Sequence, residues 1–260
     1  MKNPAPRRRE PSTDLSLGVL LLACLFLGCA SAKLPLVARP AAPPSGNDPR
    51  LAHLLEEQLK TSGVPALAAA LITTDAPLRA AVVGVREAGR DQPAERNDLF
   101  HIGSCTKPMT ADLIATLVEE GRIKWSSRLV ELLPDLAAVM RPEYREVTVE
   151  QVLSHRAGLP AYTEIDDAEF QRLAALGGGE PVAARRALAA EVLQKAPVAR
   201  PGTETHYSNA GYAIAASAVE RLTGKPWEQL IKERIFKPLG MSSCSFGFPA
   251  TTVRPQQPRG

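Results

Sequence analysis

Hydrophobic positions near the start of the folded region follow two different periods. Leucines at 51, 54, 55 and 59 recur at helical spacing, which predicts an amphipathic helix over residues 51–60 that ends at Gly63. Two apolar runs follow, at 66–73 and 78–85, with a turn-forming segment at 74–77 between them. Short apolar runs around such a turn predict a β-hairpin, although the alanines at 68–70 suit a helix equally well.

From residue 104 onward the apolar positions follow the helical period almost throughout. Thr148 and Gln151 match a capping box, and Gly121 and Gly224 supply helix stops. The pattern predicts helices from Ser104 to a stop at Gly121, at 123–133, from Thr148, twice between 166 and 195 with a break at 176–179, at 209–223 and at 226–236. We therefore expect an α+β fold, with a helix and hairpin in residues 50–103 and a mostly helical part in residues 104–240.

The N-terminal residues have the three parts of a secretory signal. Three arginines at 7–9 precede a leucine-rich, uncharged run at 15–28, and Ala30-Ser31-Ala32 provides a small-x-small cleavage site. The run is short for a transmembrane helix, which needs about 20 apolar residues. We expect residues 1–32 to be a signal peptide and the protein to be exported to the periplasm or cell envelope.

A second processing route is open at Cys29. The residues before it loosely resemble a bacterial lipobox, so cleavage after residue 28 would leave Cys29 for lipidation and anchor the protein to a membrane. The Pro-rich segment 33–49 suits either route, because it is an extended linker between the envelope and a domain over residues 50–246. Residues 247–260 are expected to be a disordered tail.

Composition narrows the classes of function. The 260 residues are 45% hydrophobic, enough for a full core, and the formal net charge is only +3. This charge gives no electrostatic case for nucleic-acid binding. The cysteines and histidines lack metal-ligand spacing, so we expect no metal and no cofactor. Nothing indicates a protein partner, and a small molecule or peptide is the expected substrate.

Ser104 and Lys107 are the first candidate catalytic pair. A serine and a lysine three residues apart on a helix lie on the same face, one turn apart. Serine is a weak nucleophile without a nearby base, and lysine can be that base if burial lowers its pKa. Gly103 allows a tight turn into the helix, which places Ser104 at a helix start where its backbone N–H favours developing negative charge. We expect Lys107 to point inward and Ser104 to open onto a buried helix.

Tyr207 and Asn209 form the second candidate pair. Pro201-Gly202 predicts a turn, after which an extended segment places Tyr207 and Asn209 on the same side. A phenol and a carboxamide together can relay a proton and hold a substrate amide. The alternative is a buried tyrosine beside a helix N-cap asparagine.

Several segments in this order and spacing resemble the β-lactamase-related serine hydrolases. The group includes class C β-lactamases, D-alanyl-D-alanine carboxypeptidases and esterases, and the resemblance covers about residues 51–246. The segments that carry it are FHIGSCTKPMT, LVEEGRIKW, LLPDL, VTVEQVLSHRAGLP, PGTETHYSNAGYAIAASAVERLTGKPW and IFKPLGMSSCSF.

This resemblance implies a role for each candidate residue. Ser104 would be the acylated nucleophile, Lys107 its base, and Tyr207 the carrier of the proton to and from the leaving group. Asn209 would hold the acyl side chain, and the Ser104 backbone N–H would be one oxyanion donor. A Ser-His-Asp triad could be drawn around His155, but the resemblance places His155 at a structural helix end. We interpret it as a hydrogen-bonded scaffold residue.

The resemblance also implies parts that the chain does not show. The family carries a Lys/His-x-Gly motif on a later strand, then further strands and a final helix, and no such motif follows Asn209 here. We expect a C-terminally truncated domain with an incomplete antiparallel sheet and one oxyanion donor missing. The leading interpretation is an exported serine hydrolase of β-lactams, D-amino-acid peptides or esters. The alternative is a catalytically silent binding protein or truncated remnant.

Overall fold

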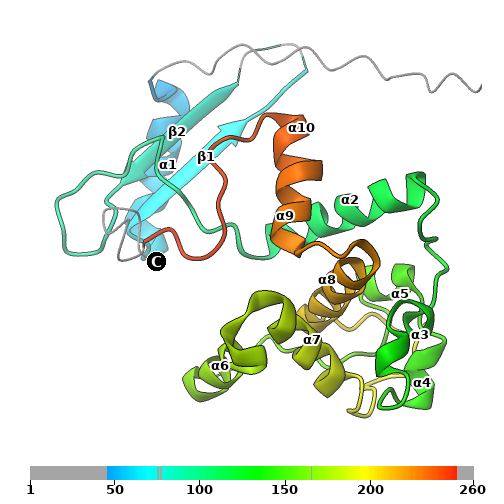
Figure 1. Ribbon diagram of the computed structural model, residues 1–260. Helices are drawn as coiled ribbons and strands as arrows, with labels where there is room; N and C mark the ends of the chain where they lie inside the picture. Colours follow the sequence, from blue (N-terminus) through cyan, green and yellow to red (C-terminus); the bar gives the residue numbers. More distant parts are fainter. Residues whose placement is uncertain (1–45, 75, 77, 165, 251–260) are drawn as a thin grey trace, which may run out of the picture. The chain divides into compact units, whose positions relative to one another are not determined.

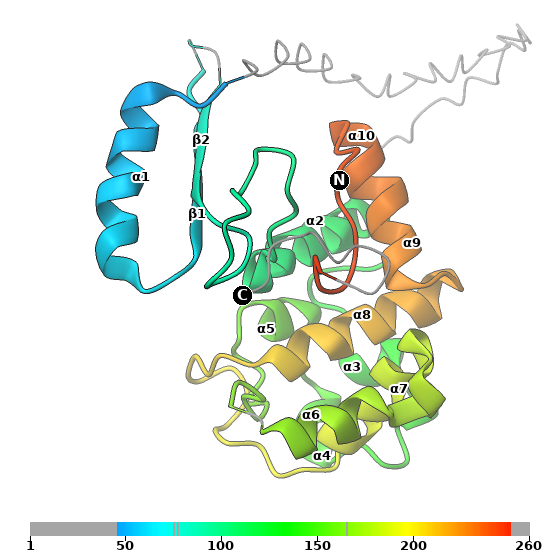
Figure 2. The same ribbon diagram turned by 90° about the vertical axis from the view of Figure 1, so that its left-hand side faces the viewer.

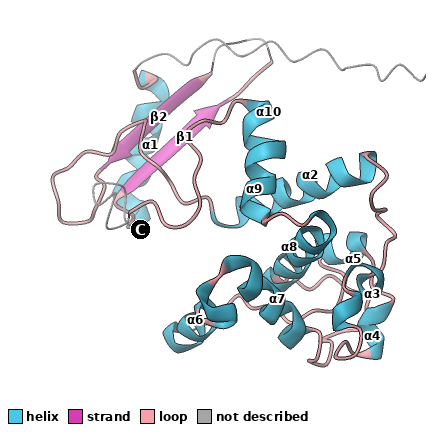
Figure 3. Ribbon diagram, viewed as in Figure 1, coloured by secondary structure: helices cyan, strands magenta, loops and turns pink. Residues whose placement is uncertain are grey.

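The computed structural model describes residues 46–250 except 75, 77 and 165. The predicted signal peptide, Cys29 and most of the linker and C-terminal tail lie outside the described residues. Figures 1 and 3 show an N-terminal helix and hairpin followed by a series of helices. The α-helices are α1 (Pro49–Ser62), α2 (Thr106–Glu119), α3 (Leu129–Leu132), α4 (Pro142–Arg145), α5 (Val149–Leu153), α6 (Asp167–Ala174), α7 (Pro181–Val192), α8 (Asn209–Thr223), α9 (Trp227–Ile231) and α10 (Lys237–Leu239). The remaining elements are the strands β1 (Ala66–Leu71) and β2 (Arg79–Gly84), the 3₁₀ turns η1 (Gly103–Cys105), η2 (Pro134–Leu136) and η3 (Leu176–Gly179), and the π-helical turn η4 (Lys232–Phe236).

The first part is a hairpin with one helix along it. β1 and β2 pair antiparallel, with Ala66 opposite Gly84 and Leu71 opposite Arg79. Ala81 and Val83, two residues apart on β2, are buried on the same face. Helix α1 contacts both strands (Figure 2). The predicted hairpin is confirmed, and the helical alternative for residues 68–70 is wrong.

Asp48 connects α1 to the hairpin. It is the N-cap residue, and its carboxylate accepts a hydrogen bond from Leu51 N at 2.8 Å. The same carboxylate accepts from Arg79 Nε at 2.7 Å, at the start of β2. The hydrogen bond from Arg79 is the main reason that the pKa of Asp48 falls to about 2. One side chain therefore caps a helix and fixes it to a strand.

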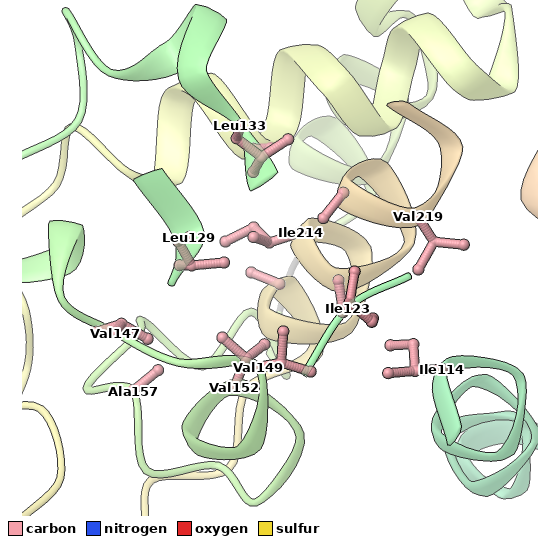
Figure 4. Packing of buried hydrophobic residues seen from close by; sticks show 14 of the residues in the cluster. Ile114, Ile123, Leu129, Leu133, Val147, Val149, Val152, Ala157, Ile214 and Val219 are labelled. Atoms are coloured by element: carbon pink, nitrogen blue, oxygen red, sulfur yellow. The ribbon is translucent and has the colours of Figure 1, made fainter. Parts of the chain in front are cut away.

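Helix α8 lies at the centre of the helical part and contacts α2, α3, α5, α7 and α9. Ser208 caps it by accepting a hydrogen bond from Gly211 N, and Gly224 ends it in a left-handed conformation. Figure 4 shows Ile214 and Val219 of α8 packed among buried side chains from the surrounding segments. These side chains include Ile114 of α2, Leu129 of α3 and Val152 of α5. The buried face of α8 is what fixes the position of its N-terminus, where Asn209 lies.

Most of the predicted helices are present, with one correction. The helix predicted from Ser104 is confirmed as η1 followed by α2, and the helices from Thr148, within 166–195 and at 209–223 are confirmed. The one at 226–236 contains a π turn and continues to Leu239. The prediction of a helix over 123–133 is wrong, because only Leu129–Leu132 is helical. Ser127 Oγ accepts from Lys124 N to close a turn, and Arg128 forms an isolated β-bridge with Thr148. These polar contacts compete with the helical hydrogen bonds of this segment.

The architecture is α+β, as predicted. Within the described residues the sheet has two strands, and helices make up most of the rest. No helix in the described part of the chain is long and apolar enough to cross a membrane.

Candidate active site

Ser104 lies in the 3₁₀ turn η1, immediately before α2, and Lys107 is the second residue of α2. In a 3₁₀ turn residues three apart eclipse one another, so the two side chains point the same way. Ser104 is exposed and Lys107 is half-buried. Ser104 thus lies at the exposed start of a helix whose buried face begins at Thr110, as expected.

A chain of hydrogen bonds joins the four predicted residues. Ser104 Oγ lies 2.7 Å from the phenol oxygen of Tyr207. Lys107 Nζ donates to Ser104 Oγ at 3.1 Å and to Asn209 Oδ1 at 2.6 Å. Residues about a hundred positions apart in sequence therefore meet around one hydroxyl group, where α2 runs beside the N-terminal end of α8 (Figure 2).

The electrostatics of this cluster act on the tyrosine. Lys107 Nζ lies 4.8 Å from the centre of the Tyr207 ring. The ammonium group of Lys107, followed by the hydroxyl of Ser104, lowers the pKa of Tyr207. Both interactions favour the phenolate, which is the form able to accept a proton. The Tyr207 side chain is 42% exposed, so the alternative of a buried tyrosine is wrong.

Asn209 is held from two sides. Its Oδ1 accepts from Lys107, and its Nδ2 donates to the backbone oxygen of Tyr162 at 2.9 Å. These two bonds fix which way the amide faces. The alternative of an N-cap asparagine is wrong, because Ser208 is the N-cap and Asn209 is the first residue of α8.

The loop 155–162 supports the segment that carries Tyr207 and Asn209. Its carbonyls accept from Gly202 N, His206 N and Asn209 N, and Pro160 O accepts from Ser208 Oγ. His155 Nδ1 accepts from Ser208 N at 3.1 Å, and the His155 ring packs on the Tyr207 ring with centroids 4.4 Å apart. The interpretation of His155 as a hydrogen-bonded scaffold residue agrees with these contacts.

Two residues of this loop have unusual backbone conformations. His155 has φ +59° and Tyr162 has φ +51°, and among the described residues they are the only non-glycines at positive φ. Such conformations cost energy and persist where surrounding contacts enforce them. The Tyr162 phenol donates to Glu191 Oε1 at 2.9 Å and accepts from Lys195 Nζ at 2.5 Å.

Sequence reasoning did not find the part played by Tyr162. Its backbone carbonyl, rather than its side chain, contacts Asn209. A backbone contact leaves no mark on residue type, so no local pattern identifies this position.

A cleft of about 360 Å³ opens beside the cluster between α2, α8 and α9. It is lined by His101, Gly103, Ser104, Thr106, Lys107, Thr110, Arg185, Asn209, Tyr212, Ala213, Ala216 and Trp227. Ser104 thus faces a space large enough for a small substrate. In the part of the chain that the structure describes, no group of three or more His, Cys, Asp or Glu residues could hold a metal ion.

The comparisons with known proteins concern the same region. The family model described as "Beta-lactamase" matches residues 51–258. Penicillin-binding protein 4 of Amycolatopsis lactamdurans is 32% identical over 175 residues, which are 67% of this chain and 43% of that protein. The D-alanyl-D-alanine-carboxypeptidase/endopeptidase AmpH of Escherichia coli K12 is 27% identical over 168 residues, 63% of this chain and 40% of that protein.

A solved structure shows the same fold. The D-amino acid amidase from Ochrobactrum anthropi matches with a TM-score of 0.59 and 25% sequence identity, over 74% of this chain and 49% of that one. This chain thus spans less than half the length of each of these three proteins.

Proposed function

Because the chain belongs to the beta-lactamase family, we propose that it is a serine hydrolase that forms an acyl-enzyme on Ser104. The observation that carries this proposal is the contact of Ser104 Oγ with Tyr207 at 2.7 Å and with Lys107 at 3.1 Å. A serine hydroxyl needs such a base within hydrogen-bond reach before it becomes a useful nucleophile.

Tyr207 is the immediate proton acceptor in this mechanism. An ammonium group has no lone pair to accept a proton, and Lys107 donates hydrogen bonds to both Ser104 and Asn209. In this proposal the lysine stabilises the phenolate of Tyr207, and the role of base expected for Lys107 from the sequence stays a prediction. The phenolate takes the proton of Ser104 as Oγ attacks the substrate carbonyl carbon.

The remaining steps return the proton. The tetrahedral intermediate breaks its bond to the leaving group, and Tyr207 gives that group the proton it took from Ser104. Water then attacks the acyl ester, Tyr207 accepts the proton of this water, and Ser104 recovers a proton as the acid product leaves. The backbone N–H of Ser104 is an oxyanion donor, and Nδ2 of Asn209 has one hydrogen left for a substrate amide oxygen.

The substrates we propose carry an activated or D-configured acyl group: β-lactams, D-amino-acid peptides or small esters. The relatives support this class, since they include a penicillin-binding protein, a D-alanyl-D-alanine carboxypeptidase and a D-amino acid amidase.

Turnover assays test the proposed activity. The full chain and Ser104→Ala should be compared on p-nitrophenyl acetate and on a peptide ending in D-alanyl-D-alanine. We expect hydrolysis of at least one substrate by the wild type alone. Equal rates for the two proteins would contradict the proposal, and acylation of Ser104 without turnover would favour a binding protein.

We also propose that the protein is exported, on the evidence of the sequence of residues 1–32. The mass of the mature protein separates the two routes. Cleavage after Ala32 gives a chain beginning at Lys33, whereas lipidation gives a heavier product beginning at Cys29 that Cys29→Ser abolishes. An uncleaved chain in the cytoplasm would contradict export.

A further inference from the structure

His155 occupies a position that controls the segment carrying the proposed base. Its ring packs on Tyr207 and also contacts Tyr212 of α8, with centroids 5.4 Å apart. Its Nδ1 is the acceptor for the backbone N–H of Ser208, the residue between Tyr207 and Asn209. A single imidazole therefore contacts the phenol ring and fixes the backbone on which that ring is carried.

This hydrogen bond defines the protonation state of the ring. A backbone N–H can only donate, so Nδ1 must carry the lone pair and the ring proton must lie on Nε2. If Nδ1 were protonated, its N–H would face the N–H of Ser208, and neither donor would have an acceptor. The amide of Ser208, a residue that is 2% exposed, would then lose its partner.

The surroundings of the ring oppose a positive charge. The groups that face it are the ammonium of Lys107 on α2, the phenol of Tyr207 and the phenol of Tyr212 on α8. The nearby imidazole of His206 is directed to Glu204 instead, at 3.1 Å. Burial of the ring, followed by the charge of Lys107, lowers the pKa of His155 below its ordinary value.

We propose that neutral His155 is a positioning residue that holds Tyr207 against Ser104, and that protonation of His155 releases Tyr207 and switches the site off in acid. This inference rests on the proposed function for its effect on catalysis.

His155→Asn is the variant that separates the positioning of Tyr207 from the protonation of the His155 ring. The Oδ1 of asparagine can replace Nδ1 as the acceptor for Ser208 N–H, and asparagine has no proton to gain near neutral pH and tolerates the positive φ of this position. Phenylalanine keeps an aromatic ring against Tyr207 but removes the acceptor. His206→Asn is the matched control, because it removes a neighbouring histidine without touching the Ser208 amide.

Kinetics across pH give the first test. Protonation of the Tyr207 phenolate lowers kcat toward acid in every variant that keeps Tyr207. We expect the wild type and His206→Asn to show an additional acid limb below about 6.5, the ordinary histidine pKa. His155→Asn should keep kcat near neutral pH and lose this additional limb. His155→Phe should lose about 10²-fold in kcat at all pH values, because a displacement of the base by about 1 Å costs that much. An unchanged acid limb in His155→Asn, or full activity of His155→Phe, would overturn the proposal.

NMR of the full chain gives a test that needs no activity. We expect the nitrogen shifts of His155 to show the Nε2–H tautomer, its pKa to lie below about 6.5, and the Tyr207 ring signals to move as His155 titrates. The Tyr207 signals of His155→Asn should stay fixed over the same range. An Nδ1–H tautomer would refute the positioning role, and so would Tyr207 ring signals whose chemical shifts stay constant as His155 titrates. Either result holds whether or not the protein hydrolyses a substrate.

Discussion

Tyr207 combines three features at the scale of the residue. Its phenol oxygen contacts the proposed nucleophile, its ring lies near an ammonium group, and its ring packs on His155. Lys107 and Ser104 lower the pKa of Tyr207, which gives this tyrosine a larger fraction of phenolate at neutral pH than tyrosine has in water. This residue carries both the chemistry and the geometry of the proposed site.

Tyr207→Phe removes the phenol oxygen and leaves the ring in place. We predict that kcat for p-nitrophenyl acetate falls by about 10²–10⁴-fold, the usual contribution of a positioned general base. The melting temperature should change little, because the Tyr207 side chain is 42% exposed. Wild-type kcat in Tyr207→Phe would exclude the phenol as base.

The residue types at the site could be predicted from sequence, but their contacts could not. Ser104 and Lys107 are three residues apart, so their proximity follows from helical geometry alone. The approach of Tyr207 and Asn209 to them depends on the packing of α8 against α2, which no local pattern encodes. The contact of Asn209 with the Tyr162 carbonyl leaves no trace in the sequence at all.

At the scale of the element, the loop 155–162 is fixed by close approach of another backbone. Gly158 has φ +67°, and a Cβ there would lie 2.2 Å from the carbonyl oxygen of Ala199. A side chain at this position would push the loop away from the segment that precedes Tyr207. The loop thus needs glycine for space as well as for conformation.

Gly158→Ala and Gly178→Ala separate these two requirements. Both positions have positive φ, but a Cβ on Gly178 would meet nothing within 4 Å. We predict that both variants lose about 1–2 kcal/mol of stability through backbone strain, measured by denaturant unfolding. Gly158→Ala alone should lose more stability and also lose hydrolytic rate. Equal effects of the two variants would show that the contact with Ala199 is unimportant.

The junction of α1 with β2 makes a prediction about pH. The pKa of Asp48 is about 2 in the folded protein and about 3.9 in an unfolded chain, so its stabilising contribution is complete above pH 4 and is lost as the pH falls toward 2. Asp48→Asn keeps an N-cap but removes the charge that pairs with Arg79.

We predict faster hydrogen exchange of the α1 amides in Asp48→Asn at about pH 7, where the wild type has the full ion pair. Glu57→Gln, which removes an exposed pair with Lys60 in the same helix, should exchange like the wild type. If Asp48→Asn also exchanges like the wild type, the Asp48–Arg79 pair does not hold α1.

Helix boundaries were predictable where capping groups mark them and wrong where they do not. The Thr148–Gln151 capping box and the left-handed Gly224 mark real helix ends. The segment 123–128 has helical periodicity but forms a turn, because Arg128 pairs with Thr148 and Ser127 accepts from Lys124 N. Periodicity records which side chains are buried, and a turn can bury the same side chains.

At the scale of the whole molecule, a two-stranded hairpin with its helix and a helical part built around α8 make up the described fold. The site lies in the helical part: Ser104 comes from η1, Lys107 from α2, Asn209 from the first turn of α8 and Tyr207 from the extended segment just before α8. Buried α8 side chains, such as Ile214, therefore support the site as well as the core. The chain spans less than half the length of the relatives described above.

Intact mass spectrometry of the full chain tests the central claim most directly. The wild type and Ser104→Ala are exposed to benzylpenicillin and, separately, to p-nitrophenyl acetate, with the exposed thiol of Cys105 present in both proteins. We predict an adduct on the wild type, equal to a whole penicillin molecule because ring opening releases nothing, or to an acetyl group from the ester. Ser104→Ala should carry neither. An adduct of equal yield on Ser104→Ala, or none on folded wild type with either reagent, would contradict the assignment of Ser104 as the nucleophile.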